Sequence, residues 1–122
     1  GIPVAALDAE QVAWPLQVRP ALGTESYAGL GGEAESPEPG EVSFVDAQGR
    51  AHARRWTHRQ SGLSAVRDST STVLIVMEAV HASARQDADA LAHELAQAIA
   101  QGWRTTAERG QLSSTAAVFV FG

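Results

Sequence analysis

The chain is organised around Arg54-Arg55-Trp56-Thr57-His58-Arg59-Gln60-Ser61, which gathers cations, an aromatic ring, an imidazole, an amide and hydroxyls. Ser64-Ala65-Val66 follows closely, and then comes the apolar run Thr72-Val73-Leu74-Ile75-Val76-Met77-Glu78. Polar groups packed this densely beside an apolar strand are typical of a binding or catalytic site. The alternative is an amphipathic edge strand with a solvated basic face, and residue types alone favour neither.

Length and composition predict one ordinary globular domain. A chain of 122 residues can bury one core but not two, and 44% of its residues are hydrophobic. No apolar run approaches the ~20 residues of a membrane helix, and the first residues lack the basic region of a signal peptide. The absence of Cys excludes disulfides and thiolate zinc sites and fits a reducing compartment. We therefore expect a cytoplasmic protein with no membrane partner.

Charge is unevenly distributed along the chain. The net charge of -5 argues against nucleic-acid binding driven by charge alone. Residues 49–66 nevertheless hold four arginines and no acid, whereas residues 24–46 hold six acids and no base. A local basic face is therefore still compatible with the sequence.

The middle of the chain predicts a β-hairpin. Residues 41–45 and 51–56 read as its two strands, and Asp46-Ala47-Gln48-Gly49 supplies the turn. The two-residue period of a strand would then place one set of polar and aromatic side chains on one face. That set is His52, Arg54, Trp56 and His58.

The flanking segments complete an α+β domain. The alternation over residues 16–19 predicts a short strand, and residues 20–40 read as a long loop whose acidic part, residues 33–40, cannot form regular structure. Residues 72–79 predict a central strand covered on both faces, and residues 115–121 a last apolar strand.

Between those two strands the sequence predicts the only long helix. Residues 83–86 form a capping box, and apolar residues then recur at helical spacing to residue 99, with Gly102 as the expected end. We expect a mixed, mainly antiparallel sheet packed against this amphipathic helix through Leu91, Leu95 and Ile99.

Residue types and spacing alone give only weak evidence for a catalytic or metal site. No histidine spacing matches a metal site, so we expect no metal and no cofactor. Ser64 stands in a broken nucleophile elbow, because the second glycine of that motif is replaced by Val66. His58 and Glu78 are the acid–base candidates, and a glutamate that ends an apolar strand needs a partner such as Arg55, Arg59 or a ligand amine.

Several motifs resemble a known family. The pattern Pro39-Gly40-Glu41-Val42, then Gly49-Arg50, then residues 53–56 with 59–61, is similar to the free-standing B3/B4 domain proteins, and residues 64–66, Thr70, Thr72 and residues 76–78 continue the match. These resemble the B3/B4 editing domain of the bacterial phenylalanyl-tRNA synthetase beta subunit, which hydrolyses tyrosine wrongly attached to the phenylalanine tRNA. The resemblance implies hydrolysis of an aminoacyl-tRNA ester and tRNA as the partner.

The resemblance also implies roles for the residues of the central stretch. Glu78 would bind the amino group of the amino acid, and Trp56 would wall the pocket or stack on the terminal adenosine. An arginine would meet phosphate or ribose. The expected catalytic residues are Glu78 and His58, the expected substrate-binding residues are Trp56, Gln60, Ser61, Ser64 and Thr72, and the expected RNA-binding residues are Arg54, Arg55 and Arg59.

Two departures from the family leave other functions open. The synthetase has a glycine-rich loop about where this chain has residues 56–61, and an N-terminal helical portion normally precedes the region of Ile2. The chain therefore reads as the C-terminal part of such a domain, with an apolar face left for the missing portion or a second copy. The alternatives to editing are a non-catalytic module that binds an amino acid or RNA, and a metabolic enzyme that uses the pocket for a free small molecule.

Overall fold

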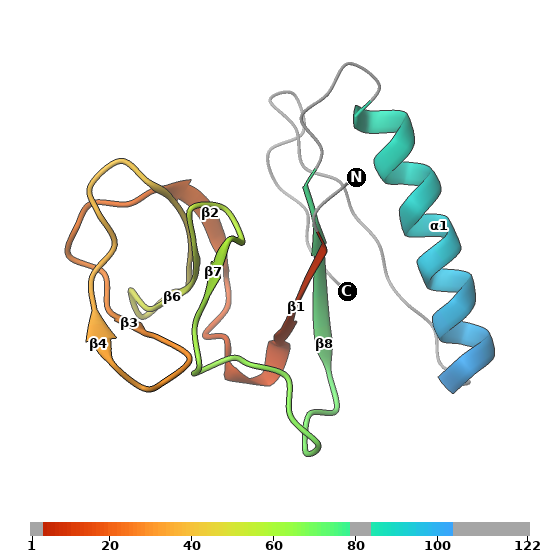
Figure 1. The fold of residues 1–122 in the computed structure, drawn as a ribbon, viewed down its shortest axis with the longest axis horizontal. Coiled ribbons are helices and arrows are strands. Elements are labelled where there is room, and N and C mark those ends of the chain that lie inside the picture. The colour runs from red at the N-terminus through yellow and green to blue at the C-terminus, as the bar shows by residue number, and fades with distance from the viewer. Residues whose placement is uncertain (1–3, 79–83, 104–122) are drawn as a thin grey trace. The chain divides into compact units, whose positions relative to one another are not determined.

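A computed structural model describes residues 4–78 and 84–103 of the chain (Figure 1). Its described elements are mainly antiparallel strands and one long helix, which confirms the α+β class. The chain divides into two compact units, residues 3–76 and residues 77–122 with 1–2. In chain order the elements are β1 (Val4–Asp8), a 3-10 turn (Ala9–Gln11), β2 (Gln17–Pro20), β3 (Tyr27–Ala28), β4 (Ala34–Glu35), β5 (Val42–Val45), β6 (Ala51–Arg54), β7 (Arg59–Gln60), β8 (Val73–Met77) and α1 (Ala84–Trp103).

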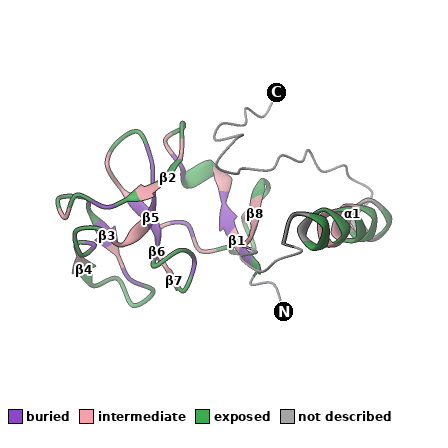
Figure 2. Cartoon of the chain, turned by 90° about the horizontal axis from the view of Figure 1, so that it is seen from above, coloured by how far each residue is buried: buried purple, intermediate pink, exposed green. Residues whose placement is uncertain are grey.

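The centre of the first unit is an antiparallel sheet in the order β2-β5-β6-β7. The predicted hairpin is confirmed, since β5 pairs with β6 with Ser43 opposite Arg54. Its turn closes through the amide of Gly49, which donates to the Asp46 carbonyl at 3.1 Å, and Gly49 has a φ of 74° that favours glycine. Burial is greatest along β5, β6 and β1 (Figure 2), and all four residues of β6 are buried.

The predicted length of the second hairpin strand is wrong. β6 ends at Arg54 because the next two residues, Arg55 and Trp56, have left-handed φ values of 50° and 60°. Residues 55–58 form a turn, so Trp56 and His58 do not continue the strand face that begins at His52.

The long loop contains more structure than its composition predicts. β3 and β4 pair within it, Tyr27 opposite Glu35, so the expectation that residues 33–40 hold no regular structure is wrong at β4. The loop closes on Glu25, a buried carboxylate that accepts hydrogen bonds from the amides of Leu22 and Gly23 and from Arg19.

β8 pairs with β1 rather than joining the central sheet among the described residues. The amide of Ala9 donates to the Thr72 carbonyl at 2.9 Å, which brings the end of β1 to the start of β8, so the two strands run antiparallel. Val73 is exposed and the other four residues of β8 are half-buried. The expectation of a strand fully covered on both faces is therefore wrong.

The predicted helix is confirmed as α1, which runs one residue beyond Gly102. Its side chains divide by burial: Leu91, Leu95 and Ile99 are half-buried, whereas His93 and Glu94 are exposed. This pattern is amphipathic, and the expectation that its apolar side covers the sheet stays a prediction. The capping box from residue 83 and the strand over 115–121 involve residues outside those described. Neither α1 nor any other described helix has the length and apolarity needed to cross a membrane.

Candidate functional site

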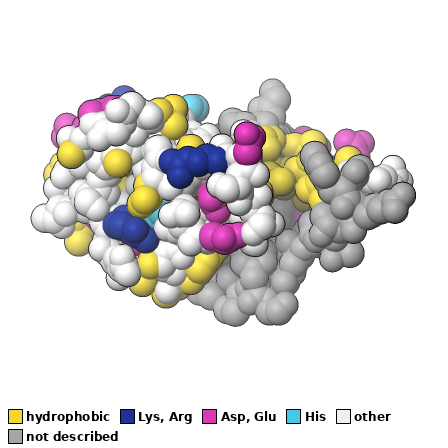
Figure 3. All heavy atoms as spheres, turned by 90° about the horizontal axis from the view of Figure 1, so that it is seen from below, with side chains coloured by type: hydrophobic (Ala, Val, Ile, Leu, Met, Phe, Trp, Pro, Cys, Tyr) yellow, Lys and Arg dark blue, Asp and Glu magenta, His cyan; other side chains and the backbone are white. Residues whose placement is uncertain are grey.

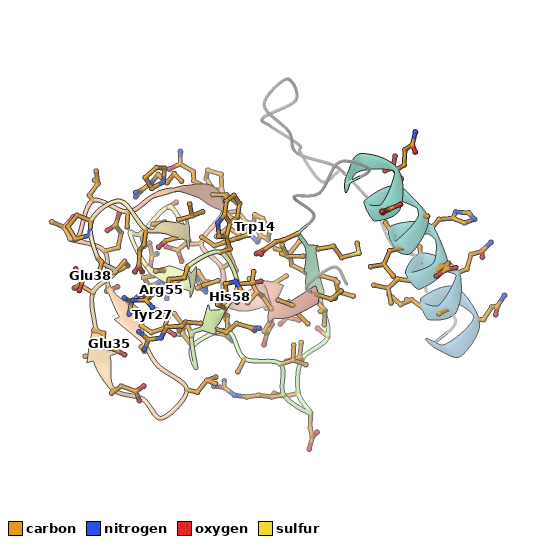
Figure 4. The ribbon with its side chains drawn as sticks, turned by 45° about the horizontal axis from the view of Figure 1, so that its top comes forward. Trp14, Tyr27, Glu35, Glu38, Arg55 and His58 are labelled. Atoms are coloured by element: carbon orange, nitrogen blue, oxygen red, sulfur yellow. The ribbon has the colours of Figure 1, made fainter. Side chains whose placement is uncertain are left out.

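The turn after β6 presents an aromatic ring and a cation to solvent. The Trp56 side chain is 45% exposed and the Arg55 side chain 62% exposed, and His58 is exposed on the same turn. Two backbone hydrogen bonds hold the turn: the amide of Trp56 donates to the Val42 carbonyl at 2.9 Å, and that of His58 to the Arg55 carbonyl at 3.2 Å. Figure 4 labels Arg55 and His58 in this region.

The other two predicted RNA-binding arginines are held by carboxylates and by Tyr27. Arg54 is buried, and its Nε lies 2.5 Å from Glu41 Oε1. Arg59 lies 2.9 Å from Glu35 Oε2. Both guanidinium groups lie over the Tyr27 ring, 5.0 Å and 5.6 Å from its centroid, a cation–π arrangement.

This arginine–tyrosine cluster also shifts the ionisation of its members. Hydrogen bonding from Arg54 is the main reason that the pKa of Glu41 is lowered, and the same pair raises the pKa of Arg54. Burial raises the pKa of Tyr27, although the two arginines oppose that effect. Arg54 therefore stabilises the fold from inside, and its expected contact with RNA gains no support from its geometry.

Glu35, Tyr27 and their neighbours also line a shallow hollow of about 320 Å³. Its walls are mostly small or apolar side chains, with Glu35 and Arg50 as the charged groups. The lining residues are Ser26, Tyr27, Ala28, Ala34, Glu35, Arg50, Ala51 and Leu63. Of the segment expected to form the pocket, residues 56–64, only Leu63 reaches this hollow.

Figure 3 shows arginine and acidic side chains intermixed on one face of the molecule, so the local basic character is largely compensated.

A chain of three polar side chains runs through the buried interior of the first unit. His52 Nδ1 lies 2.7 Å from Ser64 Oγ, and His52 Nε2 lies 2.8 Å from Asp46 Oδ2. Burial raises the pKa of Asp46, but hydrogen bonds from His52 and from three backbone amides outweigh it and hold the pKa at about 2. Asp46 is therefore ionised and accepts a hydrogen bond from Nε2, while Nδ1 shares a hydrogen bond with the Ser64 hydroxyl.

This serine–histidine–aspartate chain does not have the properties of a hydrolytic triad. Ser64 is fully buried, so a substrate carbonyl has no path to its hydroxyl. The carboxylate also contacts Nε2 and the hydroxyl Nδ1, the reverse of the usual catalytic arrangement. These three hydrogen-bonded side chains instead fasten the hairpin turn to the loop that carries Ser64.

The remaining predicted substrate-binding residues make internal contacts. Ser61 Oγ donates to the Ala28 carbonyl at 2.8 Å, and the Gln60 carbonyl accepts from the Tyr27 hydroxyl at 2.9 Å. Thr72 contributes its carbonyl to the β1–β8 pair. These contacts show how the residues support the fold, while their roles toward a substrate stay predictions.

Glu78 directly follows β8 and is half-buried. Its Oε1 atom is buried and makes no hydrogen bond within the described part of the chain. Because Glu78 and residues 56–64 belong to different units, the expectation that they share a cleft stays a prediction.

No group of three acidic or histidine side chains in the described ranges is placed to hold a metal ion.

Comparison with protein families agrees with this architecture. The family model described as the B3/4 domain matches residues 1–103, from before β1 to the end of α1. The chain belongs to the B3/4 domain family. This domain is found in the beta subunit of phenylalanyl-tRNA synthetase, which relates the B3/4 chain to the tRNA-charging machinery. A search of curated proteins gave no match.

Proposed function

We propose that this B3/4 domain hydrolyses the ester of a mischarged aminoacyl-tRNA. The observation that carries the proposal is the family match over residues 1–103, which includes the hairpin, the turn after it and Glu78. Hydrolysis of such an ester demands little from the protein, because a water must be oriented and the wrong amino acid must be distinguished by pocket shape. A full catalytic triad is therefore not required.

Two features of the first unit support the proposal. The hollow beside Tyr27 has the volume and the small apolar walls that suit one amino-acid side chain. The exposed Arg55–Trp56 turn offers a cation and an aromatic ring, which are the groups that single-stranded RNA ends bind.

Glu78 is the residue that we assign to the amino group of the substrate. A buried carboxylate oxygen without a partner is costly, and an ammonium group from a ligand would satisfy it. Glu78→Ala and Glu78→Gln should therefore reduce deacylation by tenfold or more, because each removes the charge that the amine requires.

The assay is release of labelled amino acid from correctly and wrongly charged phenylalanine tRNA. Exposed His93→Ala on α1 serves as the control variant, since it removes a titratable side chain outside the proposed site. The proposal requires faster release from the wrongly charged tRNA and a thermal midpoint of Glu78→Gln close to that of the unmodified protein. Normal release with a much lower midpoint would make Glu78 a structural residue.

A binding module without hydrolytic activity is the second candidate. It is favoured by one observation, that Ser64, which belongs to the only described serine–histidine–aspartate chain, is fully buried. The same assay separates the two functions. A protein that binds charged tRNA and slows the spontaneous loss of the amino acid would be a binding module.

A further inference from the structure

The turn after β6 keeps two consecutive residues in a strained backbone conformation. Arg55 and Trp56 have φ values of 50° and 60°, a region that non-glycine residues rarely occupy. A strained backbone of this kind persists only where its surroundings hold it, and such positions gather at binding sites. Here the turn is held from both ends, because Arg54 and Thr57 are buried on either side of the strained pair.

The left-handed backbone at Arg55 and Trp56 is accompanied by a large aromatic ring that is exposed to solvent. Trp56 is 45% exposed although Thr57, the next residue, and Arg54, two residues before it, are buried. An indole gains free energy when it leaves water, so a base that stacks on this exposed ring would recover part of that free energy.

The same turn carries the arginine that is least committed to the fold. Arg54 and Arg59 have short ion pairs of 2.5 Å and 2.9 Å and lie over Tyr27. Arg55 has a longer contact, 3.7 Å from Glu41 Oε2, and its side chain is mostly exposed. Among the three arginines that the sequence assigned to RNA, Arg55 has the longest ion pair and the most exposed side chain, so it loses least on moving to a phosphate.

We propose that the turn over residues 55–58 is a docking site for one unpaired base of single-stranded RNA. The Trp56 indole stacks on the base, and the Arg55 guanidinium pairs with the phosphate beside it. The choice of RNA rests on the proposed function, whereas the choice of these two residues rests on exposure, backbone geometry and ion pairing. With a net charge of -5, the protein gains little from general attraction to phosphates, so stacking must supply much of the affinity.

The test uses a fluorescein-labelled RNA hexamer without any amino acid, measured by fluorescence anisotropy on the full chain. Trp56→Gly removes the ring and also relieves the positive φ, so the variant should be at least as stable as the unmodified protein. Stacking on one base is typically worth a five- to hundredfold change in affinity, and we expect a loss of at least about fivefold. Trp56→Phe, which keeps an aromatic face, should retain most of the binding.

Matched variants control each half of the site. Trp14 is 47% exposed and lies on another segment, so Trp14→Gly should leave the affinity for the hexamer unchanged. Arg55→Gln should reduce the slope of log affinity against log salt by about 0.7, the value expected for one phosphate of a single strand. Arg67→Gln, at an exposed arginine that donates to the Gly62 carbonyl, should leave the slope unchanged.

The outcomes separate this inference from the proposed function. Loss of binding in Trp56→Gly with retention in Trp56→Phe supports the docking site even if no ester is hydrolysed. Equal binding by Trp56→Gly and the unmodified protein overturns it even if deacylation is normal. No binding by the unmodified protein at millimolar concentration, or equal binding to a blunt RNA duplex, also overturns it.

Discussion

Removing the hydroxyl of Ser64 tests whether the buried Asp46–His52–Ser64 chain holds the first unit together. In Ser64→Ala the Nδ1 atom of His52 loses its hydrogen-bond partner, and the ring stays fully buried beside Asp46. Because no solvent reaches this position, the ring nitrogen is left unsatisfied. The variant therefore measures the cost of one unsatisfied buried polar atom.

The expected magnitude follows from that change. An unsatisfied buried polar group costs about 1–3 kcal/mol. Ser43→Ala is the matched control, because Ser43 is equally buried and its hydroxyl has no hydrogen-bond partner among residues 4–78 and 84–103. Its loss should leave the free energy of unfolding unchanged or slightly higher, since an unpaired hydroxyl is removed from the interior.

The measurement is urea unfolding of both variants and of the unmodified protein, followed by tryptophan fluorescence. Ser64→Ala should lower the free energy of unfolding by at least about 1 kcal/mol more than Ser43→Ala does. Equal effects of the two substitutions would refute the hydrogen-bond chain. A Ser64→Ala variant with unchanged stability would also refute it, since the Asp46–His52–Ser64 hydrogen bonds would then make no contribution to the free energy of unfolding.

Three further predictions test other parts of the same unit. Gly62→Ala should cost about 1–3 kcal/mol, because its Cβ would lie 2.6 Å from a backbone carbonyl oxygen, whereas Gly31→Ala meets only a flexible carboxylate and should cost less in the same urea assay. Glu25 has a pKa of about 2 instead of 4.5, so the ionised carboxylate stabilises the fold above pH 4.5, and this stabilisation is lost as the pH falls toward 2. The difference in free energy of unfolding between the unmodified protein and Glu25→Gln should therefore shrink by about 3 kcal/mol over that range, measured by thermal unfolding. Arg54→Met removes the 2.5 Å partner of Glu41 and leaves that largely buried carboxylate with only Arg55 at 3.7 Å, so it should cost about 3 kcal/mol, the lower end for breaking a buried pair. Arg59→Met, whose carboxylate partner is partly exposed, should cost less than about 1 kcal/mol by denaturant unfolding.

The hairpin and the helix could be predicted from the sequence because their signals are local. Asp46 and Gly49 define the hairpin turn by their own conformational preferences, and the spacing of Leu91, Leu95 and Ile99 defines a helix face within three turns. The end of β6 had no such signal. Nothing in the residue types of Arg55 and Trp56 indicates a left-handed backbone, which the surrounding hydrogen bonds impose.

The candidate site was even harder to predict from local sequence patterns than the end of β6. The sequence selected three arginines as equivalent RNA contacts because they share a charge and a short stretch. Glu35, which pairs with Arg59, lies in the segment that the sequence assigned to an irregular loop. Glu41, which pairs with Arg54, was placed at the start of the first hairpin strand, but neither the register of the hairpin nor the direction of the two side chains could be read from the residue types. The exposed arginine could have been distinguished only by knowing where these acids lie.

His52 and Asp46 were missed as a pair for a related reason. Asp46 was interpreted as a turn residue and His52 as one member of a strand face, and both interpretations are correct as far as they go. The bond from His52 to Ser64, twelve residues further along the chain, forms only when the loop after β7 folds back onto the hairpin. Within the described part of the first unit, the polar groups that fasten loops to the sheet are buried and satisfied, whereas Arg55 and Trp56 on the turn after β6 are exposed. Ligand contacts are more readily made by exposed groups such as these, or by the unsatisfied oxygen of Glu78, because a residue already satisfied by the fold has little free energy left to give to a ligand.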